Sequence, residues 1–335
     1  MNSQLSYRLP PLITAGNRIL RADQMRPVLL RGINRSGLEY SEPDDGGFLA
    51  AARITQDDIR EMVKGWRANI IRLPFNQDWC LNGRGGFSAE AYLDSLDQVI
   101  AWAAEFGAYS ILDLHWLDAE TIYGTTENPI QGRTANHVPP APNEETLTLW
   151  RKLAARYKDE PAIIFDILNE PHDVLSDDPH PLNLVGLDGE VTACDETRLM
   201  PQQWSRWAGL LTAAIREIKP DGLIMVSGVN WAFDLSRVQV NEPNIVYSSH
   251  IYSNRRKRDW KKALGRYRDI PIFVGEWGGT DEDLDFGTEL ASVMSERSLG
   301  WAAWSWSDFP RLVSDAGFTA PAFGSLVRSE LSRAS

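Results

Sequence analysis

Short apolar runs rich in β-branched residues alternate along the chain with longer amphipathic stretches. This alternation is typical of βα units, which build a parallel sheet. There are eight such runs, each followed by a helical stretch or a short substitute, so the pattern predicts an α/β fold of the (β/α)8 TIM-barrel type rather than an open doubly wound sheet. The runs cover residues 27–34, 69–75, 109–115, 163–170, 223–227, 245–250, 272–276 and 301–305.

Helix starts can be read from the residues that precede the amphipathic stretches. Thr55, Ser88 and Asn143 each carry a side-chain oxygen suited to an N-cap, and Pro201 suits a first helical turn. The helix expected after the fifth strand has only the short segment 230–237 in which to form. Apolar periodicity predicts later helices over residues 256–267, 283–297 and 321–331.

We expect a single domain over residues 1–335, because no Gly/Ser linker, internal repeat or low-complexity tract divides the chain. No GxGxxG or Walker A motif follows the first strand, so the usual nucleotide-binding signature is missing. The Pro-rich stretch within residues 124–142 and the polar stretch at 176–198 are interpreted as extended loops after strands three and four. In a barrel, such loops build the active-site face.

The composition limits the classes of partner. The chain has 34 Lys and Arg residues against 46 Asp and Glu residues, a net charge of −12, so a nucleic-acid partner is not expected. The same charge favours a neutral substrate over an anionic one. No apolar run reaches the roughly 18 residues of a membrane span, so a membrane partner is not expected either. We expect the chain to act as a monomer.

Neither a metal nor another cofactor is expected. Cys80 and Cys194 are the only cysteines, too few for a CxxC metal site, and the sequence leaves open whether they pair. The five histidines show no HExxH or other metal-ligand spacing. Residues 1–10 lack the basic and apolar regions of a signal peptide, but a chain from which a signal had been removed would look the same. Localisation therefore stays open.

Two glutamates stand where apolar strands are expected to end. Glu170 lies in Ile-Leu-Asn-Glu-Pro after the fourth run, and Glu276 lies in Val-Gly-Glu-Trp at the end of the seventh. The carboxyl ends of barrel strands meet at the catalytic face, so these glutamates should face each other across the mouth. Glycosidic bond cleavage needs such a pair, because one carboxylic acid protonates the leaving oxygen while one carboxylate meets the oxocarbenium-like carbon. The alternatives are that Asn-Glu-Pro at Glu170 is only a turn motif, and that Glu276 is a solvated residue or the partner of a barrel arginine.

Tryptophan is abundant, with 13 residues in the chain. Filling a large core explains part of this number. Several tryptophans, however, stand beside Gly, Asp or Asn near predicted strand ends, where an indole face can stack on the apolar face of a sugar ring. These candidates are Trp79, Trp116, Trp231 and Trp277.

The segment Ile-Ile-Phe-Asp-Ile-Leu-Asn-Glu-Pro-His at 163–172 resembles the signature of glycoside hydrolase family 5, the cellulase family of a retaining clan. That signature is an apolar run with an acidic or amide residue, followed by Asn-Glu-Pro. The resemblance extends over nearly the whole chain, from Arg-Gly-Ile-Asn at 31–34 to Trp-Ser-Trp at 304–306. It implies Glu170 as the acid/base and Glu276 as the nucleophile, with carboxyl groups roughly 5–5.5 Å apart.

The resemblance also implies three polar site residues on the second to fourth strands. Arg72, in Asn-Ile-Ile-Arg-Leu-Pro, resembles the arginine that hydrogen-bonds the nucleophile, although a purely structural buried arginine is the alternative. His115, in Leu-Asp-Leu-His, resembles the histidine that contacts sugar hydroxyls in subsite −1. Asn169 resembles the asparagine that holds the 2-hydroxyl group.

Three further residues follow from the same resemblance on the sixth and eighth strands. His250 and Tyr252, in Ser-His-Ile-Tyr, resemble the pair in which the histidine sits near the acid/base and the tyrosine hydroxyl touches the nucleophile. Trp304 resembles the indole platform under the −1 sugar, with Trp301 and Trp306 as nearby competitors for that place. Glu170 has no obvious cation beside it and lies near a second carboxylate, so we expect its pKa to be raised.

These observations favour an endo-β-1,4-glucanase acting on a neutral β-linked polysaccharide or oligosaccharide. A β-1,4-mannanase, or an exo-acting or oligosaccharide-acting β-glucosidase, stays an alternative because the −1 residues are shared across the family. A catalytically silent carbohydrate-binding barrel would predict loss of a glutamate or of Arg72, and all are present. An aldolase-like barrel would need a lysine on a strand, and none of the eight runs contains one.

Overall fold

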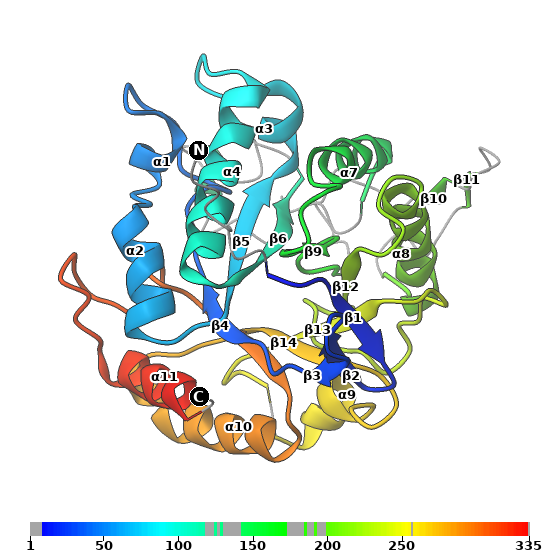
Figure 1. The fold of residues 1–335 in the computed structure, drawn as a ribbon. Helices are drawn as coiled ribbons and strands as arrows, with labels where there is room; N and C mark the ends of the chain where they lie inside the picture. The colour runs from blue at the N-terminus through cyan, green and yellow to red at the C-terminus, as the bar shows by residue number, and fades with distance from the viewer. Residues whose placement is uncertain are drawn as a thin grey trace.

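The computed structural model describes residues 9–117, 142–172, 199–255 and 257–333 (Figure 1). It also describes the backbone of two short antiparallel strand pairs, namely β7 (Gly124–Thr125) with β8 (Asn128–Pro129) and β10 (Leu184–Val185) with β11 (Val191–Thr192). Apart from these strands and Pro142, the loops predicted at 124–142 and 176–198 lie outside the described residues, as does Cys194. The thiol of Cys80 is buried.

Eight parallel strands close into a barrel, which confirms the predicted (β/α)8 fold. The strands pair in chain order, and the eighth closes the barrel on the first, with Trp301 opposite Arg31. Every strand overlaps one of the predicted runs. They are β4 (Arg31–Asn34), β5 (Ile70–Asn76), β6 (Tyr109–Trp116), β9 (Ile163–Asp166), β12 (Leu223–Ser227), β13 (Ile245–Ile251), β14 (Ile272–Trp277) and β15 (Gly300–Ala303).

Helices surround the barrel (Figure 1). The predicted N-caps are confirmed, because the side chains of Thr55, Ser88 and Asn143 each accept a hydrogen bond from a backbone amide in the first turn. Pro201 is the first residue of its helix, as predicted. None of the described helices is long and apolar enough to cross a membrane. The helices are α1 (Gly47–Ala51), α2 (Gln56–Arg60), η1 (Glu61–Gly65), α3 (Gln77–Asn82), α4 (Ala89–Phe106), α7 (Glu144–Arg156), α8 (Pro201–Arg216), η2 (Lys257–Asp259), α9 (Trp260–Leu264), η3 (Asp281–Asp283), α10 (Leu284–Glu296) and α11 (Ala322–Ser332).

The segment after the fifth barrel strand forms a tight turn, so the helix expected at 230–237 is wrong. Asn230, Trp231 and Ala232 have φ angles of 59°, 60° and 56°, in the left-handed region. Gly228 pairs with Ala232 through an isolated β-bridge, which folds the chain back on itself. A right-handed helix cannot continue through three such residues.

A small antiparallel sheet precedes the barrel at its N-terminal end. It consists of β1 (Leu12–Ala15), β2 (Arg18–Arg21) and β3 (Arg26–Pro27), so the run predicted at 27–34 is divided between this sheet and β4. Leu12 and Ile19 belong to the same apolar cluster as the side chains inside the barrel. The hairpin therefore closes the bottom of the barrel with apolar surface.

The barrel interior has an apolar layer near its N-terminal end and a polar layer above it. Side chains alternate between the interior and the helices, as the period of a strand requires. The apolar layer includes Ile70, Ile111, Ile164, Met225, Val246 and Phe273. Two residues further along their strands come the buried polar side chains Arg72, Asp113, Asp166, Ser227 and Ser248. The polar layer forms the floor of the site at the barrel mouth.

Candidate active site

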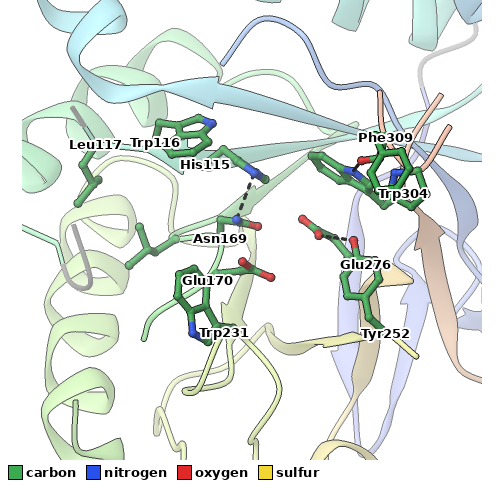
Figure 2. A pocket seen from close by; sticks show the side chains of 12 residues that line it. His115, Trp116, Leu117, Asn169, Glu170, Trp231, Tyr252, Glu276, Trp304 and Phe309 are labelled. Atoms are coloured by element: carbon green, nitrogen blue, oxygen red, sulfur yellow. Dashed lines mark hydrogen bonds between the residues drawn. The ribbon is translucent and has the colours of Figure 1, made fainter. Parts of the chain in front are cut away.

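A cavity of about 340 Å³ opens at the carboxyl end of the barrel (Figure 2). Eight of the predicted site residues line it, and Arg72 and His250 lie just beneath them, each bonded to one of the two glutamates. Trp79 and Trp277, two of the four tryptophans predicted to stack on a sugar, are not brought to the cavity. The lining residues are His115, Trp116, Leu117, Leu168, Asn169, Glu170, Trp231, Tyr252, Glu276, Trp304, Phe309 and Pro310.

Glu170 and Glu276 face each other across this cavity (Figure 2). An oxygen of Glu170, an oxygen of Glu276 and a ring nitrogen of His250 all lie within 4.8 Å of one another. Pairs that retain configuration lie roughly 5–5.5 Å apart, whereas inverting pairs need about 6.5–9.5 Å to admit a water molecule. The observed approach suits direct attack by one carboxylate.

A β-bulge at Gly275 decides which residue of β14 enters the cavity. Ser249 pairs with Val274 and His250 with Glu276, so Gly275 is an extra residue in the ladder. Phe273 points into the barrel, and strict alternation would send Glu276 toward the helices. The bulge reverses the alternation and turns Glu276 inward.

The same bulge sends Trp277 outward, which corrects the prediction that this residue binds substrate. Its side chain is fully buried and packs edge-to-face on Trp301, with Phe323 also in contact. Trp79 is likewise buried, against Phe48 and Tyr92. Neither indole leaves a face free for a sugar ring.

Arg72 is the centre of a buried network beneath the cavity. Its side chain is fully buried. The guanidinium forms ion pairs with the carboxylates of Asp113, Asp166 and Glu276, which hold it in place. Its Nη1 donates to Glu276 Oε1 at 2.8 Å and to Asn34 Oδ1 at 2.9 Å. Its Nε donates to Asp166 Oδ2 at 3.0 Å. Its Nη2 donates to Asn169 Oδ1 at 2.8 Å and lies 2.9 Å from Asp113 Oδ1.

Asp113 and Asp166 are site residues that the sequence reasoning did not single out. Burial raises the pKa of both carboxyl groups, and the charge of Arg72 opposes the rise. A protonated Asp113 or Asp166 carries no negative charge. More of the positive charge of Arg72 is then balanced by Glu276. Their signal in the sequence was an acidic residue at an inward position of an apolar strand, which is rarely tolerated without a partner.

His250 and Tyr252 each hold one glutamate from the sixth strand. His250 Nδ1 lies 2.8 Å from Glu170 Oε1, and the Tyr252 hydroxyl donates to Glu276 Oε2 at 2.8 Å. Burial lowers the pKa of His250 to about 3, so its imidazole is neutral and offers Glu170 an N–H dipole rather than a charge. Burial raises the pKa of Tyr252, which therefore keeps its proton.

Glu170 lies between these groups with only 22% of its side chain exposed. Burial raises its pKa, as predicted, although the positive charge of Arg72 acts in the opposite sense. His115 and His172 act in the same opposing sense as Arg72, but burial outweighs them. Glu170 can therefore keep its proton to a higher pH than an ordinary glutamate.

His115 and Asn169 form a chain of hydrogen bonds that fixes their orientation. His115 Nδ1 lies 2.6 Å from Asp113 Oδ2, and Asn169 Nδ2 lies 3.3 Å from His115 Nε2. Burial lowers the pKa of His115 to about 4, which makes Nε2 the acceptor of this bond. One amide hydrogen of Asn169 is left to point at a ligand.

Aromatic rings enclose the cavity on two sides. Trp304 stacks on His115 with centroids 5.3 Å apart, and its indole N–H donates to the carbonyl oxygen of Phe309. Its competitors Trp301 and Trp306 are buried away from the cavity. Trp116 and Trp231 line the opposite side, with Trp231 beside Glu170 (Figure 2).

Among the described residues, two groups of side chains could each offer three atoms to a metal ion, and both include Glu276. They are Asp113, His115 and Glu276, and Glu170, His250 and Glu276. Both oxygens of Glu276 already accept hydrogen bonds, from Arg72 and from Tyr252. A metal ion would have to displace these donors.

The amino-acid sequence of the chain is similar to those of known proteins. The family model described as cellulase (glycosyl hydrolase family 5) matches residues 25–310. The chain is 22% identical to endoglucanase MaCel5A of Microbulbifer sp. over 89% of its length, and 22% identical to endoglucanase E-5 of Thermobifida fusca over 84%. It spans about half the length of these curated relatives, 51% and 53%.

Solved structures share the fold. The β-glucanase SdGluc5_26A of Saccharophagus degradans, in complex with cellotetraose, superposes with a TM-score of 0.74 at 20% identity, covering 98% of this chain and 95% of that one. The catalytic domain of the Thermobifida fusca endoglucanase, also with cellotetraose, gives a TM-score of 0.70 at 20% identity, covering 97% and 98%. The barrel fold of this chain is thus shared with two proteins whose structures contain cellotetraose.

Proposed function

The chain belongs to glycosyl hydrolase family 5, the cellulase family, and from this premise we propose that it is a retaining endo-β-1,4-glucanase. The observation that carries the proposal is the approach of Glu170 and Glu276 within 4.8 Å, with different partners on each. Relatives named endoglucanases support the choice of β-1,4-glucan as substrate. We also propose that residues 1–335 form one catalytic domain.

In the first step, Glu276 attacks the anomeric carbon while Glu170 protonates the departing glycosidic oxygen. Arg72 and Tyr252 both donate to Glu276, so its lone pairs are held toward the cavity and its negative charge is favoured. The raised pKa of Glu170 keeps the proton that the leaving oxygen needs. The glucan chain then departs on the side of Glu170 and Trp231.

In the second step, a water molecule replaces the departed sugar. Ester formation has removed the charge of Glu276, so a negative charge on Glu170 no longer faces a second carboxylate. Glu170 now accepts a proton from the water, whose oxygen attacks the anomeric carbon and releases Glu276. The remaining amide hydrogen of Asn169 can hold the 2-hydroxyl group through both steps, and the Trp304 indole supports the sugar ring in subsite −1.

The test is a reducing-sugar assay on carboxymethylcellulose, barley β-glucan, glucomannan, β-mannan and xylan. The proposal expects the highest kcat/KM on the two β-glucans, with a mixture of oligosaccharides released early, as internal cleavage requires. A higher rate on β-mannan would establish the mannanase alternative. Release of glucose alone would indicate exo-action, and no product from any polymer would favour a non-catalytic binding barrel.

A further inference from the structure

A second cavity, of about 710 Å³, lies beside the catalytic one. It is lined by residues that follow β4, by the segment before α2, and by the loop after β15. The same loop forms part of both cavities, because Phe309 and Pro310 line the first while Trp306 and Arg311 line the second. Trp304, the platform proposed for the −1 sugar, begins this loop. Trp304 lies across the first cavity from Glu170 and Trp231, where the leaving group is proposed to depart, so the second cavity adjoins the proposed glycone side (Figure 2).

Three arginines line this cavity. Arg53 and Arg311 are exposed, and within the part of the chain that the structure describes their guanidinium groups make no hydrogen bond or ion pair. An exposed, unpaired arginine is ordinary on a surface. Two of them in one concave site beside a buried third are unusual in a chain whose net charge is −12.

Arg35 is the buried member, with 1% of its residue surface exposed. Its Nη1 donates to the carbonyl oxygen of Ser36 at 2.6 Å and its Nη2 to that of Arg53 at 2.6 Å, so neutral dipoles take most of its hydrogens. Its Nη2 also bonds Asp58 Oδ2 at 3.5 Å and its Nη1 bonds Ser307 Oγ at 3.2 Å, while its Nε has no partner. Arg35 is thus held in the cavity wall by one ion pair and by neutral groups, and it adds a third guanidinium beside the two exposed ones.

The carboxylates in the cavity wall are already occupied by other donors. This matters because three acidic residues line the same cavity and could otherwise pair with Arg53 and Arg311 themselves. Asp57 pairs with Arg60, Asp58 accepts from Thr55 and from the Trp306 indole, and Asp315 accepts from the amides of Gly317 and Thr319. Among the described residues of the lining, the charged groups left without a partner are those of Arg53 and Arg311.

We propose that this cavity binds the carboxylate of an acidic sugar unit, such as a uronate or a carboxymethylated glucose, on the glycone side of the glucan chain. Arginine presents a planar fork of donors that matches a carboxylate, and Arg53 and Arg311 supply such forks from the rim. Tyr40, Ser41 and Ser307 add hydroxyl groups to the same wall for the sugar itself. The overall negative charge disfavours anionic polymers in general, so this local positive site selects substrates with scattered acidic units. This inference rests on the proposed function.

The test compares Arg53→Gln/Arg311→Gln with the wild type on carboxymethylcellulose and on neutral barley β-glucan. We expect kcat/KM on carboxymethylcellulose to fall about fivefold to tenfold, since charge-assisted hydrogen bonds are the stronger kind, and kcat/KM on barley β-glucan to stay within about twofold. The wild-type advantage on carboxymethylcellulose should shrink as salt is raised, because the arginines are exposed. Equal losses on both polymers, or no loss on either, would overturn the proposal.

Arg67→Gln is the matched control. Arg67 is also exposed, and its φ of 66° resembles the 52° of Arg53, but it lies before β5 at the opposite end of the barrel. It should leave both rates unchanged. A separate titration of glucuronate, with glucose as reference, follows binding by NMR. If the wild type cleaves neither polymer, the proposed function fails, while glucuronate binding that depends on Arg53 and Arg311 would keep the anion site. Glucuronate binding that is unchanged in the double variant would remove the anion site alone.

Discussion

The imidazole of His172 lies flat against the indole of Trp231, with ring centroids 3.9 Å apart and planes 9° apart. His172 is fully buried, and its Nδ1 donates to the backbone carbonyl oxygen of Glu170 at 2.8 Å. One side chain thus supports both the proposed acid/base and the aromatic wall beside it. The stacking also helps to hold the left-handed backbone of Trp231, which costs a non-glycine residue about 1 kcal/mol.

Replacing His172 with alanine should therefore weaken the wall that receives the leaving group. We expect kcat/KM on cellotetraose to fall by about tenfold, a loss typical of a stacked ring pair, mostly through KM. Hydrolysis of an aryl cellobioside, whose small leaving group needs less of that wall, should fall less. His172→Phe should keep most of the stacking and recover most of the loss on cellotetraose. Equal losses on both substrates would instead assign His172 to Glu170 alone.

The raised pKa of Glu170 sets the alkaline limb of the pH profile. Glu170 must be protonated to act as acid, so activity should be present below its folded-state pKa and be lost as the pH rises through that value. Stability follows the same direction, because an unfolded chain releases this proton more readily, and the contribution of Glu170 is lost as pH rises. The measurements are kcat/KM and the free energy of unfolding in urea, each against pH. Glu170→Gln should be nearly inactive, and its free energy of unfolding should fall less than that of the wild type at alkaline pH. If the residual activity of Glu170→Gln kept the alkaline limb of the wild type, the assignment of this limb to Glu170 would be contradicted.

Small anions should rescue the two glutamate variants differently. In Glu276→Ala, azide can enter the space of the lost nucleophile and give an α-glycosyl azide from an activated β-glycoside. In Glu170→Ala, the covalent intermediate still forms, and azide then replaces water to give a β-glycosyl azide. NMR of the products separates the two. The reverse pattern would exchange the roles of the two residues.

Removing the Arg72 guanidinium should damage both stability and activity. Arg72→Leu leaves Asp113, Asp166 and Glu276 without their shared cation, and breaking a buried ion pair on one side costs about 3–5 kcal/mol. Arg72→Lys should recover part of the stability but little activity, because one ammonium cannot reach all of the partners. Urea unfolding and kcat/KM measure the two effects. Adding Asp166→Asn to Arg72→Leu should restore some stability without activity, and a failure to do so would contradict the charge argument.

Gly275→Ala should impair activity by moving His250. A Cβ at this position would lie 2.3 Å from Ser248 Oγ and 2.9 Å from His250 Nε2, so the imidazole that bonds Glu170 must move. We expect a loss in kcat of at least about 100-fold, in the range of removing a general-acid function. Gly209→Ala, in α8 with nothing within 4 Å of its Cβ, is the control and should be neutral or slightly stabilising. Unchanged activity in Gly275→Ala would show that the bulge tolerates a side chain.

The sequence predicted the strands and helix starts because each depends on local chemistry, such as the Ser88 N-cap or the apolar run that ends at Glu170. The inward positions of His115, His250 and Tyr252 follow from simple alternation along their strands. Trp277 was misplaced because alternation fails where Gly275 is inserted, and an isolated glycine in a strand only hints at a bulge. Asp113 and Asp166 were missed because their role depends on three strands meeting at Arg72.

The hairpin that closes the bottom of the barrel imposes an order on folding. The amide of Thr14 donates to Asn244, 230 residues later, and Asn17 donates to the carbonyl oxygen of Tyr267, 250 residues later. During synthesis, residues 12–21 must therefore remain undocked until most of the barrel has been made. Contacts between residues so far apart in the sequence slow folding, because the chain loses the entropy of closing a long loop before the stabilising contacts form. A stretch made before every barrel strand is thus placed among the last.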